Sequence, residues 1–179
     1  MKVGLVGFSG SGKTTVFNAL TGLTAETGFG AARGKTNLGA VKVPDDRVLA
    51  LAGLYKPKKT TFAEVSFCDV AAAAAGTQGQ SLDDATLRAM REVDALCQVV
   101  RGFPGAAGEP AAPLTEARNL EEEMNLSDLI LIEKRLERIR KEKGKDAEIH
   151  LLERIKAGLE AGTPLRRMDG IGAEEWVSL

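Results

Sequence analysis

The sequence has few cysteines, little net charge and no long hydrophobic run. Only two cysteines, Cys68 and Cys97, occur among 179 residues, and neither stands in a CxxC or other metal-ligand spacing. This excludes a disulfide-stapled extracellular domain and a cysteine-based zinc site. Because both cysteines lie in apolar runs, we expect buried, reduced thiols, as in a cytoplasmic protein.

The charge balance and the hydropathy pattern exclude further classes. Lys plus Arg number 24 against 25 Asp plus Glu, a net charge of −1, so the chain does not bind nucleic acid through bulk positive charge. No apolar stretch approaches the roughly 18 residues of a membrane span. The apolar start meets a glycine-rich loop and does not resemble a secretory signal. We expect a cytoplasmic protein with no membrane partner.

Strands and helices are expected to alternate over the first hundred residues. Short apolar or alternating runs predict strands at Lys2–Val6, Ala40–Val43, Thr61–Cys68 and Ala95–Val100. Helical patterns between them lie at Thr14–Leu20, from Asp45 or Asp46 to Leu54, and at Ser81–Arg91. This order predicts an α/β fold with a parallel, doubly wound sheet.

The second half of the chain changes character after a Gly- and Pro-rich linker at residues 102–113. Apolar residues then recur at helical spacing, at Leu129, Ile132, Leu136, Ile139, Leu152, Ile155 and Leu159. We predict an antiparallel helical hairpin over residues 113–165, either a free coiled coil or a packed bundle face. Residues 166–179 would return to the domain formed by residues 1–112.

One motif carries recognisable chemistry. Residues 7–14, GFSGSGKT, fit G-x-x-x-x-G-K-[ST] with a strand before and a helix after. Such a loop points backbone N–H groups at phosphate oxygens, while the lysine reaches the β- and γ-phosphates and the Ser or Thr hydroxyl binds Mg²⁺. The expected nucleotide-binding residues are Ser9, Gly10, Ser11, Gly12, Lys13, Thr14 and Thr15.

Two further residues are candidates for the metal site. Asp69 follows the third strand, where a carboxylate would hold Mg²⁺ together with Thr14; the alternative is an Asp that caps a turn. Lys13, Thr14 and Asp69 are therefore the predicted catalytic group. Thr36, in the long loop before the second strand, is a candidate for contact with metal and γ-phosphate, or an ordinary loop threonine.

The near-zero net charge conceals an uneven distribution. Residues 133–145 hold seven basic and three acidic side chains, whereas residues 109–128 hold six acidic and one basic. The basic tip of the predicted hairpin could dock on RNA phosphates, or it could be a solvated helix face.

Several stretches together resemble the YchF or Obg-like ATPase family of P-loop NTPases. They are residues 12–21 (GKTTVFNALT), 43–47 (VPDDR), 56–59 (KPKK), 91–95 (REVDA) and 133–138 (EKRLER), in the family's order and near its spacing. The resemblance implies a Mg²⁺-dependent nucleotide hydrolase that takes ATP or GTP and associates with ribosomes, with a coiled-coil arm after the fourth strand.

The chain departs from the family at three points. Ala72 stands where the family's Asp-x-Ala-Gly has glycine, and Arg33 aligns with the family's first-switch threonine. The sequence also stops before the base-reading motif and the TGS domain, so we expect part of a longer protein, whose unfinished sheet edge would favour self-association. GTP and ATP both stay open.

These observations leave a leading interpretation and two alternatives. The leading one is slow, Mg²⁺-dependent hydrolysis of a purine nucleoside triphosphate. The first alternative is a non-hydrolysing scaffold that binds nucleotide, RNA or the ribosome. The second alternative is a small-molecule kinase, which shares the phosphate loop but also needs an Arg-rich lid and a substrate-binding segment. The YchF-like stretches and the predicted hairpin argue against a kinase.

Overall fold

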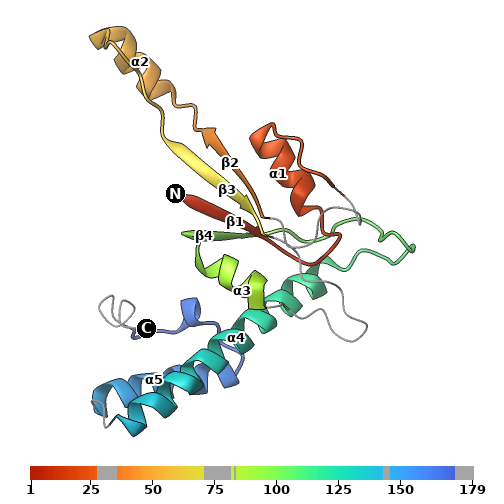
Figure 1. The fold of residues 1–179 in the computed structure, drawn as a ribbon, viewed down its shortest axis with the longest axis vertical. Coiled ribbons are helices and arrows are strands. Elements are labelled where there is room, and N and C mark those ends of the chain that lie inside the picture. The colour runs from red at the N-terminus through yellow and green to blue at the C-terminus, as the bar shows by residue number, and fades with distance from the viewer. Residues whose placement is uncertain (28–35, 71–81, 83, 143–145, 172–179) are drawn as a thin grey trace. The chain divides into compact units, whose positions relative to one another are not determined.

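The computed structural model describes residues 1–27, 36–70, 82, 84–142 and 146–171. Its contacts divide the chain into two units, Met1–Ala117 and Arg118–Leu179. The first unit contains β1 (Lys2–Val6), α1 (Lys13–Thr21), β2 (Asn37–Lys42), α2 (Asp46–Tyr55), β3 (Glu64–Asp69), α3 (Asp84–Arg91) and β4 (Ala95–Gln98) (Figure 1). The predicted α/β order is therefore confirmed.

The sheet is mixed, which corrects the expectation of a wholly parallel one. Its strand order is β2-β3-β1-β4; β1 pairs in parallel with β3 and β4, whereas β2 pairs antiparallel with β3. The physical reason lies in α2, which extends beyond the ends of β2 and β3 instead of crossing a face of the sheet (Figure 1). A chain that turns back in this way produces an antiparallel pair.

The strands at the two edges of the described sheet are β2 and β4. Cys97 in β4 is exposed, so the expectation that both thiols are buried is wrong for Cys97 and confirmed for Cys68. An apolar run alone predicts burial. Residues on an edge strand have a neighbouring strand on one side only, so they are covered less fully than residues on a central strand. Self-association through such an edge stays a prediction.

The core of the first unit gathers around β1. Leu5, Phe17, Cys68 and Val70 are buried completely or nearly so. They come from β1, from the helix that follows it, and from β3 with the residue after it. This packing fixes the ends of β1 and β3 against α1. The phosphate-loop motif connects β1 to α1 at this place.

The second unit is a helical hairpin, formed by α5 (Asp146–Glu160) and most of α4 (Pro113–Lys141), and followed by the short 3₁₀ helix η1 (Leu165–Arg167). One core cluster contains Ile132, Leu136, Ile139, Leu152, Ile155 and Leu159, with Leu129 packed against it. This is the predicted seam. Met168 and Ile171 also pack there, so this part of the expected return segment contacts the hairpin.

The boundary between the units falls inside α4, at residues 117 and 118, five residues after the predicted one.

Within the described ranges, no helix combines the length and the apolar character that a bilayer crossing requires.

Candidate functional site

The loop between β1 and α1 has the backbone that its motif predicts. Gly10 and Gly12 have φ angles of 79° and 94°, a left-handed region in which side chains are strained. A Cβ on Gly7 would collide with the carbonyl oxygen of Val99, the residue after β4. Residue 7 therefore has to be glycine because the Val99 carbonyl approaches its backbone closely, and residue 12 because its left-handed backbone makes the turn into α1.

Lys13 is the first residue of α1 and is only 6% exposed. Its Nζ donates hydrogen bonds of 2.9 Å to the carbonyl oxygens of Gly7 and Phe8, at the start of the loop. Burial lowers the pKa of Lys13, and the attraction of Asp69 opposes that shift. A buried ammonium that faces carbonyl groups has only partial compensation for its lost hydration, so an anion beside the loop would be strongly attracted.

Asp69 lies beside this lysine and joins three elements. It is the last residue of β3, is 4% exposed, and accepts a 2.7 Å hydrogen bond at Oδ2 from the Thr14 hydroxyl of α1. The same oxygen accepts a 3.3 Å bond from Nδ2 of Asn37, the first residue of β2. The structure thus brings the predicted catalytic group together and adds Asn37, which the sequence did not single out.

The remaining predicted residues lie around the loop in different environments. Ser9, Gly10 and Thr15 are exposed, while Ser11 is 4% exposed and its Oγ has no hydrogen-bond partner among the described residues. Thr36 is exposed just before β2, and no hydrogen bond joins it to Thr14 or Asp69 in the part of the chain that the structure describes. Arg33 and Ala72 lie outside the described residues.

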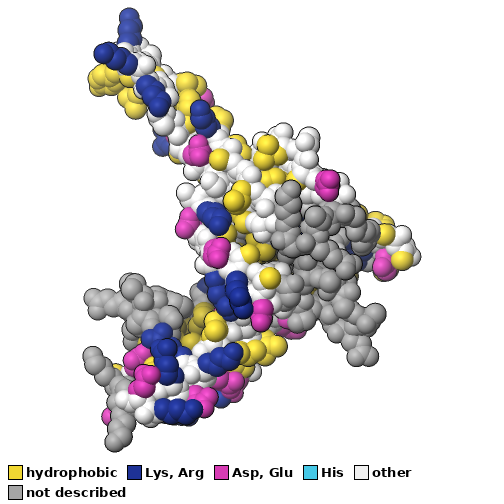
Figure 2. All heavy atoms as spheres, in the orientation of Figure 1, with side chains coloured by type: hydrophobic (Ala, Val, Ile, Leu, Met, Phe, Trp, Pro, Cys, Tyr) yellow, Lys and Arg dark blue, Asp and Glu magenta, His cyan; other side chains and the backbone are white. Residues whose placement is uncertain are grey.

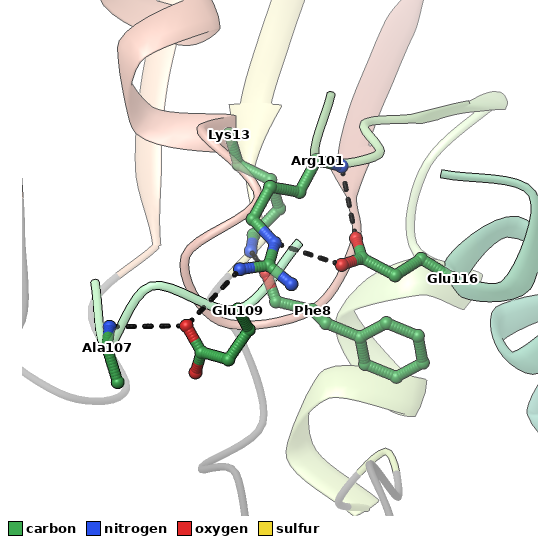
Figure 3. A network of polar contacts seen from close by, with 6 residues as sticks. All are labelled: Phe8, Lys13, Arg101, Ala107, Glu109 and Glu116. Atoms are coloured by element: carbon green, nitrogen blue, oxygen red, sulfur yellow. Dashed lines mark hydrogen bonds and ion pairs between the residues drawn. The ribbon is translucent and has the colours of Figure 1, made fainter. Parts of the chain in front are cut away.

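The segment after β4 packs against the other side of the loop. A Cβ on Gly12 would lie 3.9 Å from Cε1 of Phe103. Nearby, the backbone N and Nε of Arg101 each donate a 3.0 Å hydrogen bond to the Glu116 carboxylate, and Glu109 lies 4.0 Å from the guanidinium (Figure 3). The mostly buried ion pair of Arg101 with Glu116 anchors the segment that borders the loop.

The arrangement fits a phosphate group and Mg²⁺. The first N–H groups of α1 have no partners within the helix, and the buried Lys13 adds positive charge at the same end. The unpartnered Ser11 hydroxyl points to a missing polar contact. Among the residues described, no group of three or more His, Cys, Asp or Glu side chains is arranged to hold a metal ion. Mg²⁺ needs none, because one carboxylate with a hydroxyl and substrate phosphates satisfies it.

Comparison with known proteins gives a consistent family. The model of a family described as 50S ribosome-binding GTPase matches residues 2–135. The ribosome-binding ATPase YchF of Bacillus subtilis (strain 168) is 34% identical over 181 residues, covering 94% of this chain and 49% of that protein. The Obg-like ATPase 1 of Oryza sativa subsp. japonica is 30% identical over 186 residues, covering 97% and 47%.

A solved structure shares the fold. The YchF GTPase of Schizosaccharomyces pombe matches with a TM-score of 0.76 at 29% identity, covering 98% of this chain and 51% of that one. The chain thus spans about half the length of the relatives that it matches.

Proposed function

Because this chain belongs to the 50S ribosome-binding GTPase family, and within it to the YchF or Obg-like ATPases, we propose that it binds a purine nucleoside triphosphate with Mg²⁺ and hydrolyses it slowly. The observation that carries the proposal is the contact of Thr14 with Asp69 beside the buried Lys13, at the end of a phosphate loop. GTP and ATP are both candidate substrates.

Each residue has a defined task in this proposal. The backbone N–H groups from Gly10 to Thr15 bind the β-phosphate, and Lys13 exchanges its bonds to the loop carbonyls for phosphate oxygens. Thr14 and Asp69 would hold Mg²⁺, which neutralises charge on the phosphates during transfer. Catalysis then rests on positioning and electrostatics, and residues 71–75 are all alanine, so they offer no glutamine to orient water. We therefore expect slow turnover.

Association with ribosomes in the cytoplasm is the second part of the proposal. The bacterial relatives are named ribosome-binding, and the family model carries the same description. The predicted contact surface was the basic tip of the hairpin. Several of its basic side chains form ion pairs with glutamates, among them Arg135 with Glu148 and Arg140 with Glu153. This pairing reduces the charge that the hairpin offers to RNA.

Replacing Lys13 and Thr14 tests nucleotide binding. We expect Lys13→Ala to abolish binding of a fluorescent GTP or ATP analogue, because the loop loses its only lysine. Thr14→Ala should weaken binding mainly when Mg²⁺ is present. Lys42→Ala, an exposed lysine on β2, is the matched control and should bind as the wild type does. Unchanged titration of Lys13→Ala would refute the site.

A non-hydrolysing scaffold is the competing function, favoured by Ala72 and Arg33 at the positions where the family differs. Single-turnover hydrolysis with Mg²⁺ distinguishes the two. Measurable turnover supports the enzyme, whereas nucleotide binding without turnover, restored by Ala72→Gly combined with Arg33→Thr, supports the scaffold.

A further inference from the structure

A basic turn follows α2 on the first unit. We define it as Tyr55–Lys59, the sequence YKPKK, which contains three lysines, one tyrosine and no acidic residue. All of its side chains are exposed, and Tyr55 is 73% exposed. Basic and hydrophobic side chains lie next to one another over this part of the molecule (Figure 2). A tyrosine that is mostly exposed among lysines contributes little to the packing of the sheet.

The lysines of the basic turn differ in their partners from several basic side chains of the hairpin. In the described part of the chain, Lys56, Lys58 and Lys59 form no ion pair, whereas Lys141 pairs with Glu137 and Lys156 with Glu133. The positive charge of the turn is therefore available to an external anion. The nearest acidic residues in sequence, Asp46 and Glu64, lie at the far end of α2 and on β3.

The backbone of the basic turn is strained at its first lysine. Lys56 ends α2 with φ 44° and ψ 55°, and it is the one non-glycine residue with positive φ among those described. Glycine is the usual residue at such a helix end, because a Cβ is disfavoured there. The chain holds a lysine instead, which places three cationic groups within four residues.

Lysines beside an exposed aromatic ring match the chemistry of unpaired nucleic acid. Ammonium groups bind successive phosphates, and an aromatic face stacks on a base that duplex pairing would hide. We propose that the basic turn binds an unpaired segment of RNA, with the lysines on its phosphates and Tyr55 stacked on a base. This inference rests on the proposed ribosome association and gives it a contact surface on α2 instead of on the hairpin.

Fluorescence anisotropy with a labelled single-stranded RNA decamer tests the proposal. We expect the variant K56A/K58A/K59A to weaken binding and to make log affinity less steep against log salt by about 2, since each phosphate contact on a single strand contributes about 0.7. Tyr55→Ala should weaken binding roughly tenfold, while Tyr55→Phe keeps the stacking face and near wild-type affinity.

The comparison variant is R140A/K141A, which removes two hairpin cations that pair with Glu153 and Glu137 and should leave RNA affinity nearly unchanged. The proposal is overturned if the chain does not bind the decamer, or if the hairpin variant loses affinity and the turn variant does not. Equal binding to an RNA duplex with no effect of Tyr55→Ala also overturns it, as does preference for anionic phosphatidylglycerol vesicles or for a protein surface.

Nucleotide titration of the same variants separates the two proposals. Turn variants that bind the fluorescent nucleotide normally but retain full RNA affinity contradict this inference alone. Normal nucleotide binding by Lys13→Ala contradicts the proposed function instead.

Discussion

At the scale of single residues, two hydrogen bonds converge on Oδ2 of Asp69. Thr14 donates one from α1, and Asn37 donates the other, because β2 and β3 pair antiparallel with Asn37 and Asp69 in register. Asn37 is therefore expected to position the Asp69 carboxylate for Mg²⁺.

Asn37→Ala should weaken the Mg²⁺ affinity of the nucleotide complex about tenfold, as loss of a hydrogen bond to a metal-binding carboxylate does. Titration of Mg²⁺ into the complex with a fluorescent nucleotide measures this, and nucleotide affinity in EDTA should not change. Asn119→Ala, at an exposed asparagine of α4, is the control. Equal loss with and without Mg²⁺ would mean that Asn37 has only a structural role.

The sequence pointed to Thr36 instead of its neighbour Asn37. A side-chain contact across strands depends on the pairing partner and its direction, and neither is encoded locally. The strand–loop–helix context of the phosphate loop could be predicted, because it depends on residues that are adjacent in the chain; phosphate binding by these residues stays a prediction.

At the scale of elements, α2 is unusual in that none of its residues is buried. Asp45 caps its start by accepting a 2.9 Å hydrogen bond from the N–H of Arg47, and the left-handed Lys56 ends it. Local signals alone thus define this helix, which explains why its bounds were predicted closely. The antiparallel β2–β3 pair was missed because a strand–helix–strand pattern resembles a parallel crossover unit.

Lys56→Gly should stabilise the end of α2, because glycine adopts the left-handed region without the penalty of about 1 kcal/mol or more that other residues incur. We expect a higher midpoint in urea unfolding together with weaker binding of the RNA decamer. Ala52→Gly, one turn earlier within the helix, should lower the midpoint, because it reduces the free energy of unfolding by about 0.5–1 kcal/mol. A lower midpoint for Lys56→Gly would contradict the strain argument.

At the scale of the whole molecule, the two cysteines report on the integrity of the first unit. Cys68 is 1% exposed, and burial raises the pKa of its thiol, so little reactive thiolate is present. Cys97 is exposed on β4. One thiol per native chain should react rapidly with a maleimide or with Ellman's reagent at pH 7, and the second only on unfolding.

Replacing Cys97 by serine should remove the rapid phase, whereas replacing Cys68 by alanine should keep it. Rapid reaction of both thiols in the native chain would show that β3 opens readily. Unfolding of the hairpin has to be followed with a separate probe, because neither cysteine belongs to the second unit.

The position of the unit boundary within α4 bears on how the hairpin could be removed. A deletion that begins at Pro113, where the helix starts, would take Glu116 away from Arg101, whose side chain is only 19% exposed. The guanidinium would keep only the more exposed Glu109 at 4.0 Å. Removing the closer partner of a mostly buried ion pair costs up to roughly 3–5 kcal/mol, enough to unfold a small domain. A hairpin-free nucleotide domain should therefore keep the first turn of α4 through Ala117 and join it to a new ending beyond that residue.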